Sequence, residues 1–98
     1  MKVDKTIENG KAVFKLEGRL DSTTSPELEK EIMDVIGDLN ELVLDLEDLE
    51  YTSSAGMRVL LSAQRIMNSQ GSMKVINVRS EIMDIFEITG FNRILTIE

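Results

Sequence analysis

The chain has no cysteine and no histidine among its 98 residues. Without these two residue types it has no disulfide framework, no thiolate nucleophile, no Ser-His-Asp triad and no ordinary zinc site. It also lacks a Gly-rich nucleotide loop of the GxxxxGK or GxGxxG kind. A chain this short has little room for a deep substrate pocket. These absences predict a protein that is not an enzyme, has no cofactor and binds no metal tightly.

Basic residues are in the minority, with 11 Lys and Arg against 18 Asp and Glu, so the formal net charge is −7. A surface of that charge repels phosphate backbones, which argues against a nucleic acid partner. No apolar run approaches the about 18 residues that a membrane span needs, and residues 1–4 have no apolar signal-peptide region. The absence of cysteine fits a reducing compartment. We therefore expect a cytoplasmic protein without a membrane partner.

Aromatic residues and proline are scarce: the chain has three Phe, one Tyr, no Trp and one Pro. Its core must therefore consist mostly of Leu, Ile, Val and Met. Hydrophobic residues make up 42%, an ordinary fraction for a globular protein, and 98 residues suffice for one domain but not for two. Neither an internal repeat nor a linker composition is visible. We expect residues 1–98 to form one domain.

Five segments have the pattern of β-strands, and we expect them at residues 3–7, 12–16, 42–46, 74–78 and 94–97. The pair Asn9-Gly10 between the first two is typical of a hairpin turn, so those two strands should be antiparallel. Residues 42–46 form a nearly continuous apolar run, which indicates a central strand buried on both faces.

Three helices are expected between these strands. The first has Ser25 as its N-cap, Pro26 at its first position and Gly37 at its end. The second covers about residues 54–70 after a polar loop at 47–53, and the third is capped by Ser80 and closed by Gly90. The order β, β, α, β, α, β, α, β implies crossover connections. It predicts the α/β class, with a mixed β-sheet and helices packed against at least one face.

The segment between the central strand and the second helix is rich in hydroxyl groups, because Thr52, Ser53 and Ser54 precede Gly56. In open α/β sheets, binding sites gather beyond the carboxyl ends of the strands. The start of a helix offers free N–H groups and a partial positive charge, so a phosphate on one of these hydroxyls would be tolerated. A simpler interpretation also fits: one hydroxyl is the N-cap of the helix, and Gly56 permits close packing.

A resemblance to a known family favours the first interpretation. The run Ser53-Ser54-Ala55-Gly56-Met57 resembles the signature of STAS-domain anti-sigma factor antagonists, in which a loop leads to Asp-Ser-Ser/Thr-Gly-Leu at the head of a helix. The runs Gly18-Arg19-Leu20-Asp21, before the first helix, and Thr89-Gly90-Phe91, after the third, also resemble that family. The resemblance covers almost the whole chain. It implies a STAS domain over residues 1–98, with a mixed sheet and helices packed against it.

The resemblance also implies a partner-switching cycle. In this family the unmodified antagonist binds an anti-sigma factor, which is also a serine kinase, and so frees a sigma factor. The kinase phosphorylates one serine of the antagonist and thereby ends the binding, and a serine phosphatase restores it. Carried over to this chain, the phosphorylated residue is Ser54. The residues that would bind the partner are Asp21, Thr52, Ser53, Ala55, Gly56 and Met57.

Two positions depart from the family signature. Ser53 stands where the family often has aspartate, and Ala55 stands where a second hydroxyl residue follows the phosphorylated serine. Ser53 lacks the carboxylate that shapes kinase recognition, and it places a competing hydroxyl one residue away from Ser54. An alternative therefore stays open: a STAS interaction module that is never phosphorylated, such as a subunit associated with a transporter.

The neighbouring candidates each have a simpler interpretation. Asp21, which resembles a family residue that helps to engage the kinase, also suits a turn or a local cap. The acidic stretch at residues 47–50 can meet a basic partner or form a solvated face, and we favour the face. Met57 can serve an adaptable interface or the core, and we expect the core. Arg58 can touch a phosphate, although its helical spacing favours an exposed side chain without a role.

Overall fold

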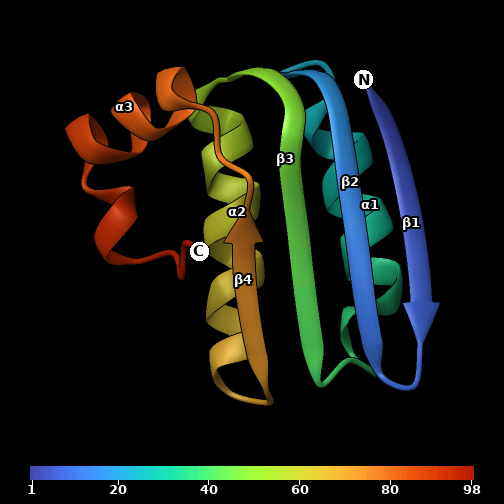
Figure 1. Cartoon of the computed structure of the whole chain (residues 1–98). Coiled ribbons are helices and arrows are strands. Elements are labelled where there is room, and N and C mark those ends of the chain that lie inside the picture. Colours follow the sequence, from blue (N-terminus) through green and yellow to red (C-terminus); the bar gives the residue numbers. More distant parts are fainter.

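The computed structural model describes all of residues 1–98, which begin with a β-hairpin (Figure 1). Strand β1 (Lys2–Glu8) pairs antiparallel with β2 (Lys11–Leu20). Asn9 and Gly10 between them have φ angles of 51° and 79°. A two-residue turn with positive φ at both positions matches the right-handed twist of the strands, which is why Asn-Gly is favoured there. The predicted hairpin is confirmed.

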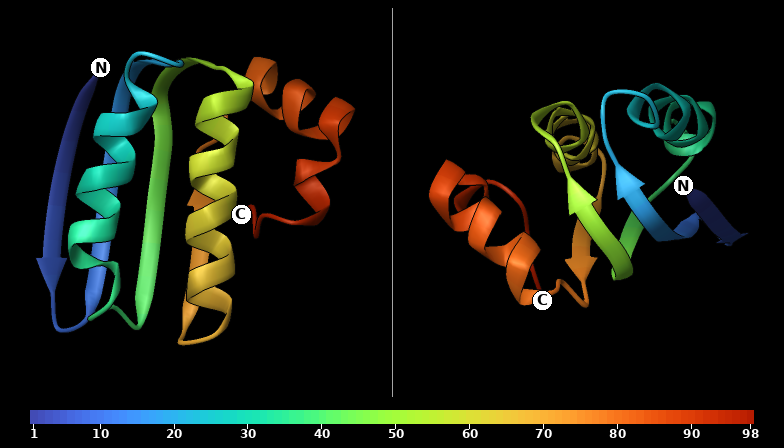
Figure 2. Two further views of the ribbon diagram at one scale, coloured as in Figure 1. Left: turned by 180° about the vertical axis from the view of Figure 1, so that it is seen from behind. Right: turned by 90° about the horizontal axis from the view of Figure 1, so that it is seen from above.

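The hairpin leads into alternating helices and strands. These are α1 (Ser25–Ile36), β3 (Glu41–Thr52), α2 (Ser54–Asn68), β4 (Ser72–Ile76), α3 (Ser80–Thr89) and the short 3-10 helix η1 (Phe91–Arg93). The four strands lie in the order β1-β2-β3-β4, and β3 runs parallel to both of its neighbours. Helices α1 and α2 cover one face of this mixed sheet, and α3 lies beside its β4 edge (Figure 2). The predicted α/β class is confirmed.

The core lies between the sheet and the two helices that cover it. Strands β2 and β3 and helices α1 and α2 contribute most of its fully buried side chains: Ala12, Phe14, Leu16, Leu28, Ile32, Leu42, Leu44, Leu46, Leu60, Ala63 and Met67. Val75 of β4 and Phe86 of α3 are also 0% exposed. Because side chains alternate along a strand, Val43 points to the face opposite Leu42 and Leu44, yet it is only 3% exposed. Strand β3 is therefore buried on both faces around Val43, as its apolar run predicts, whereas Glu41 and Asp45 on the same face as Val43 are half-buried.

Both strands that lead to the candidate site are longer than predicted. Strand β2 continues to Leu20 and β3 continues to Thr52, so the expected polar loop at 47–53 is wrong for residues 47–52. Register shifts interrupt the β2–β3 ladder at two points between Lys15 and Arg19. A bulge places two residues opposite one and so breaks the period-two pattern by which a strand is recognised in a sequence.

The predicted helix starts at Ser25 and Ser80 are one residue off. Thr24 is the N-cap of α1, whereas Ser25 is its first helical residue and donates its hydroxyl to the Asp21 carbonyl. Arg79 is the N-cap of α3, and the Ser80 hydroxyl donates to the Glu81 carboxylate over 2.9 Å. Each serine side chain has a closer partner than the helix amides, so neither acts as a cap.

The two glycines predicted to end helices behave differently. Gly90 closes α3 with φ of 80°, the left-handed conformation that favours glycine. Gly37 follows α1 at the predicted place, but its φ of −61° is helical and needs no glycine.

The C-terminal part of the chain departs most from expectation. Strand β4 spans Ser72–Ile76 rather than 74–78, because Asn77 adopts φ of 56° and leaves the strand. Residues 94–97 form no strand: a single parallel bridge joins Ile97 to Val75. The preceding 3-10 turn leaves too few extended residues for a longer ladder. Leu95, 4% exposed, fixes this segment to the core instead.

Candidate functional site

The ends of β2 and β3 bring two distant parts of the sequence together. The strands are parallel neighbours, and Leu20 pairs with Thr52 at their carboxyl ends. The residues that follow, Asp21 and Ser53, therefore leave the sheet at the same edge, where α1 and α2 also begin (Figure 2). The Ser53 amide donates to the Leu20 carbonyl over 2.8 Å, which joins the two exits.

Ser53 is the N-cap of α2. Its backbone is extended, with φ of −90° and ψ of 174°, and its hydroxyl oxygen accepts the Gly56 amide over 3.3 Å. The Ser53 carbonyl accepts the Met57 amide over 3.0 Å and the Thr52 hydroxyl over 3.2 Å. The capping interpretation of the hydroxyl cluster is therefore confirmed for Ser53, whose side chain and carbonyl hold the first turn of α2.

Ser54 is the first residue of α2, and its side chain is exposed. Its hydroxyl makes no hydrogen bond within the chain. The hydroxyls of the two residues before it, Thr52 and Ser53, each make one. The expected position at the head of the second helix is confirmed. Among the three consecutive hydroxyls, that of Ser54 is the one free to react.

Gly56 has a steric role at this junction. A Cβ atom added there would lie 2.6 Å from Leu20 Cγ and 2.7 Å from Thr52 Oγ1, both far inside contact distance. Only a residue without a side chain lets the first turn of α2 approach the ends of β2 and β3 this closely. Leu20 is 0% exposed and Thr52 is 2% exposed, so the contact lies at the edge of the core.

Asp21 organises the loop between β2 and α1. Its carboxylate accepts the amides of Thr23 and Thr24 over 3.0 and 3.1 Å, and the Thr24 hydroxyl lies 3.3 Å away. The amide of Thr24, followed by that of Thr23, holds the pKa of the Asp21 carboxyl below its ordinary value. Asp21 is therefore a charged local cap, half-buried at the same edge as Ser53 and Ser54.

A shallow groove separates the first turns of α1 and α2. It has a volume of about 210 Å³ and is lined by Ser22, Ser25, Pro26, Glu29, Ala55, Arg58 and Val59. Ala55 is half-buried in this groove, whereas Arg58 is exposed. Met57 turns the other way and is 5% exposed, so its predicted place in the core is confirmed.

The structure divides the predicted site residues into two groups. Ser54 is exposed, and Asp21, Ser53 and Ala55 are half-buried, so these four contribute to one surface. The other three are buried beneath it: Thr52, Gly56 and Met57. The buried three can shape the surface, but they offer a partner almost no contact area of their own.

Two contacts of the β2 end were not predicted from the sequence. Leu20 limits the space at Gly56, and Arg19 stacks on the Tyr51 ring with its guanidinium carbon 4.3 Å from the ring centroid. Both contacts depend on the register of β2 against β3, which is irregular just before them. Neither the contact of Leu20 with Gly56 nor that of Arg19 with Tyr51 can be predicted from neighbouring residues in the sequence.

The acidic part of β3 already has a basic partner in the chain. Lys15 Nζ lies 3.6 Å from the Asp48 carboxylate and 3.9 Å from that of Glu47. The charge of Asp48, and then that of Glu47, raises the pKa of Lys15. These side chains lie on the solvated face of the sheet, which agrees with the interpretation favoured from the sequence.

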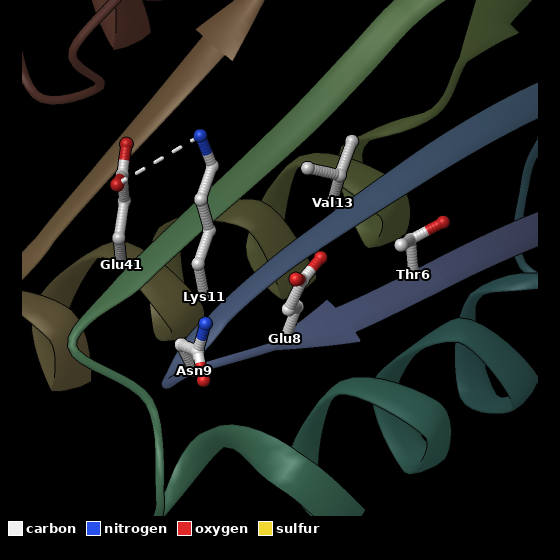
Figure 3. Close-up of a pocket in the computed structure, with 6 residues that line it drawn as sticks. All are labelled: Thr6, Glu8, Asn9, Lys11, Val13 and Glu41. Atoms are coloured by element: carbon white, nitrogen blue, oxygen red, sulfur yellow. Dashed lines mark ion pairs between the residues drawn. The ribbon is translucent and has the colours of Figure 1, made fainter.

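The largest depression in the surface lies at the opposite end of the strands. It has a volume of about 510 Å³ and is lined by Thr6, Glu8, Asn9, Lys11, Val13 and Glu41 (Figure 3). Lys11 Nζ and the Glu41 carboxylate are 4.0 Å apart across it, and the other side chains do not converge on a common point.

No group of three or more Asp and Glu residues is arranged to hold a metal ion. None of the helices combines the length and the hydrophobicity that a membrane-spanning helix requires.

Comparisons with known proteins agree on one family. The family model that describes the STAS domain matches residues 2–98. A Bordetella bronchiseptica protein named as an anti-sigma factor antagonist, BtrV, is 35% identical over 93% of this chain and 80% of its own length. The crystal structure of an anti-sigma factor antagonist from Mycobacterium paratuberculosis has a TM-score of 0.88 at 23% identity, over 98% of this chain and 83% of that one.

SpoIIAA of Bacillus, an anti-sigma factor antagonist, is similar in both of its states. Its unphosphorylated form has a TM-score of 0.79 over 99% of this chain and 87% of that one. Its phosphorylated form has a TM-score of 0.78 over 99% and 91%, and both are 18% identical to this chain. At such identities the likeness to solved structures shows the fold alone.

Proposed function

Because the chain belongs to the STAS domain family and, within it, to the anti-sigma factor antagonists, we propose that it binds an anti-sigma factor through the surface around Ser54. The bound anti-sigma factor releases a sigma factor. The anti-sigma factor is also the serine kinase that phosphorylates Ser54 and thereby ends the binding, and a serine phosphatase reverses the modification. These events take place in the cytoplasm, where a sigma factor acts.

The free hydroxyl of Ser54 is the observation that carries this proposal. It is exposed at the first residue of α2, at the edge where β2 and β3 end, and no group of the chain bonds to it. A kinase can therefore bring ATP to it without unfolding the loop. The γ-phosphoryl group moves from ATP to Ser54 Oγ, the hydroxyl proton passes to a base of the kinase, and ADP leaves.

Ser53 is the competing hydroxyl, and its geometry makes it the poorer acceptor. Its oxygen accepts the Gly56 amide as the N-cap of α2. Phosphorylation of Ser53 would place a bulky group into that cap and disturb the first turn. Ser53 therefore takes a structural role at the position where the family signature often has aspartate.

The phosphate acts on the partner surface more than on the fold. It adds a charge of about −1.5 to −2 at the positive end of α2, where an anion is tolerated. An anti-sigma factor that closes over this surface must desolvate that charge, and so loses affinity. The likeness of this chain to SpoIIAA in both states supports a switch that leaves the fold intact.

The seven predicted site residues have separate roles in this proposal. Ser54 is the switch, and the partner contacts the surface of Asp21, Ser53 and Ala55 beside it. The buried residues Thr52, Gly56 and Met57 hold that surface in place. The chain itself performs no catalysis in this cycle, because the kinase and the phosphatase supply the chemistry.

The test is to incubate the protein with its cognate kinase and ATP and to locate the phosphate by mass spectrometry. We expect one phosphate on Ser54 in the parent, none in Ser54→Ala, and a phosphate still on Ser54 in Ser53→Ala. A phosphate that persists in full on Ser54→Ala would place the switch at another residue. A kinase that binds the protein but modifies neither serine would replace this proposal with the unmodified interaction module.

A further inference from the structure

Arg58 is an uncommitted basic side chain one helical turn after Ser54. All six lysines of the chain lie within 4.0 Å of a carboxylate. Arg19 stacks on an aromatic ring, and Arg79 donates to a backbone carbonyl. Arg58, Arg65 and Arg93 make no ion pair and no side-chain hydrogen bond, although the chain has 18 acidic residues, and of these three only Arg58 lies within one turn of Ser54. Its guanidinium is therefore available to a group that the unmodified chain does not yet carry.

The helix places Arg58 on the same side as Ser54. Side chains four residues apart on a helix are neighbours, with Cβ atoms about 5–6 Å apart. Arg58 also lines the groove between α1 and α2, where Glu29 is the one acidic side chain. Glu29 forms no ion pair with it, so the groove leaves the guanidinium uncompensated.

We propose that Arg58 is the partner of the phosphate that the proposed function places on Ser54, so that the phosphorylated form is held by an ion pair within α2. This inference rests on Ser54 being the modified residue. A phosphoserine presents three strong acceptor oxygens, and the planar guanidinium fork binds such a group with two parallel hydrogen bonds. A carboxylate such as that of Glu29 carries half the charge of the phosphate dianion, so it competes poorly for the Arg58 guanidinium.

Two of the backbone amides in the first turn of α2 already have acceptors within the chain. The amides of Gly56 and Met57 already donate to the hydroxyl and the carbonyl of Ser53. Those two donors are not free for a phosphate on Ser54. Arg58 supplies the formal positive charge nearest along the helix. The ion pair lays the phosphate over the mouth of the α1–α2 groove, beside Ala55.

The experiment measures the second ionisation of the phosphate directly. Phosphoserine is incorporated genetically at position 54 of the full chain, and its pKa is followed by 31P NMR titration. Two acidic side chains belong to the elements around this site, Glu29 in the α1–α2 groove and Asp21 in the β2–α1 loop, and both are present in every variant. Arg58 favours the dianion, so Arg58→Ala should raise this pKa by about half a unit, a threefold change in the ionisation constant.

Two further variants separate charge from structure. Arg58→Lys keeps a charge at the same place and should restore part of the shift. Arg65→Ala removes the same charge from the same helix and is the matched control. Arg65 lies about 16 Å from Ser54 along the helix axis, beyond the screening length of about 8 Å at physiological salt. Arg65→Ala should therefore leave the pKa of the phosphate on Ser54 unchanged.

Equal pKa values in the parent and Arg58→Ala would overturn this inference, as would an equal shift in Arg65→Ala. Because the phosphoserine is installed without a kinase, the result does not depend on whether a kinase recognises Ser54. A kinase that ignores Ser54 would refute the proposed function, whereas a phosphate indifferent to Arg58 would refute only the ion pair.

Discussion

The amide of Ser53 donates a 2.8 Å hydrogen bond to the carbonyl of Leu20, and this bond ties the exit of β3 to the exit of β2. One residue later the chain turns into α2, with Ser54 exposed at its head. The side chain of Leu20 then limits the space at Gly56. The position of the Ser54 hydroxyl thus depends on contacts between segments more than 30 positions apart in the sequence.

Gly56→Ala should destabilise the protein, although alanine normally stabilises a helix by up to about 1 kcal/mol relative to glycine. The added Cβ would meet Leu20 Cγ at 2.6 Å. We expect a net loss of about 1–3 kcal/mol, measured by urea unfolding, because the surrounding side chains must shift. Gly37→Ala is the control: nothing lies within 4 Å of its added Cβ, so it should be neutral or stabilising. Equal effects of the two substitutions would contradict the steric role of Gly56.

Ser53→Ala should cost about 0.5–2 kcal/mol of stability, because it removes the side-chain cap of α2. Ser54→Ala removes a hydroxyl without a hydrogen bond and should change stability by less than about 0.5 kcal/mol. Both are measured by urea unfolding in the unmodified protein. The order of the two effects is the decisive point. A larger loss for Ser54→Ala would mean that the two serines exchange roles at the helix start.

Much of the fold could be predicted because it depends on local patterns. The Asn9-Gly10 turn, the apolar run at 42–46 and the hydroxyl-rich helix start each follow from neighbouring residues. The lengths of β2 and β3 could not be predicted, because bulges between Lys15 and Arg19 break their alternation. The steric fit at Gly56 depends on that irregular register, so its contact with Leu20 could not be predicted either.

The predictions of the helix N-caps were wrong for a different reason. A Ser-Pro pair suits an N-cap followed by the first helical residue, yet Thr24 takes the cap position and the Ser25 hydroxyl donates to the Asp21 carbonyl. Thr24 also donates its hydroxyl to the Arg19 carbonyl over 2.9 Å. Several hydroxyl residues in one loop compete for the same backbone groups. Which of them becomes the N-cap depends on where β2 ends, and the N-cap preferences of the residues do not decide it.

Leu44→Ala should cost roughly 2–5 kcal/mol, because the side chain is removed from a packed core. Leu44 is 0% exposed in the central strand, against α1 and α2. The free energy of unfolding in urea is the measurement. Val13→Ala, on the opposite and half-buried face of β2, is a suitable comparison and should cost less. A loss well under about 1 kcal/mol for Leu44→Ala would contradict the central position of β3.

Asp21→Asn should remove a pH-dependent contribution to stability. The amides of Thr24 and Thr23 lower the pKa of Asp21 in the folded protein. A carboxyl with a depressed folded-state pKa stabilises the protein above its unfolded pKa, and this contribution is lost as the pH falls through the folded pKa. The stability gap between parent and variant should be constant near neutral pH and shrink below about pH 4. Urea midpoints across that range test this, and a gap independent of pH would refute it.

Ser54→Asp should weaken the binding of the anti-sigma factor and leave the fold intact. The new carboxylate lies at the positive end of α2, so the melting temperature should stay close to that of the parent. At the partner surface the same charge must be desolvated. A full phosphate should cost about 2–4 kcal/mol of binding, or about 30- to 1000-fold in affinity, and aspartate less because its charge is smaller. Ser54→Ala should bind like the parent, since it adds no charge.

Asn68→Asp provides the matched control for that experiment. This substitution adds one negative charge to an exposed position of α2 about 21 Å from Ser54 along the helix axis. Asparagine and aspartate have nearly the same shape, so only the charge changes. Dissociation constants of the four proteins for the cognate anti-sigma factor should separate Ser54→Asp from the other three. If Asn68→Asp weakened binding as much, the effect would come from net charge rather than from the head of α2. If Ser54→Asp bound like the parent and melted at the same temperature, Ser54 would not lie in the binding surface.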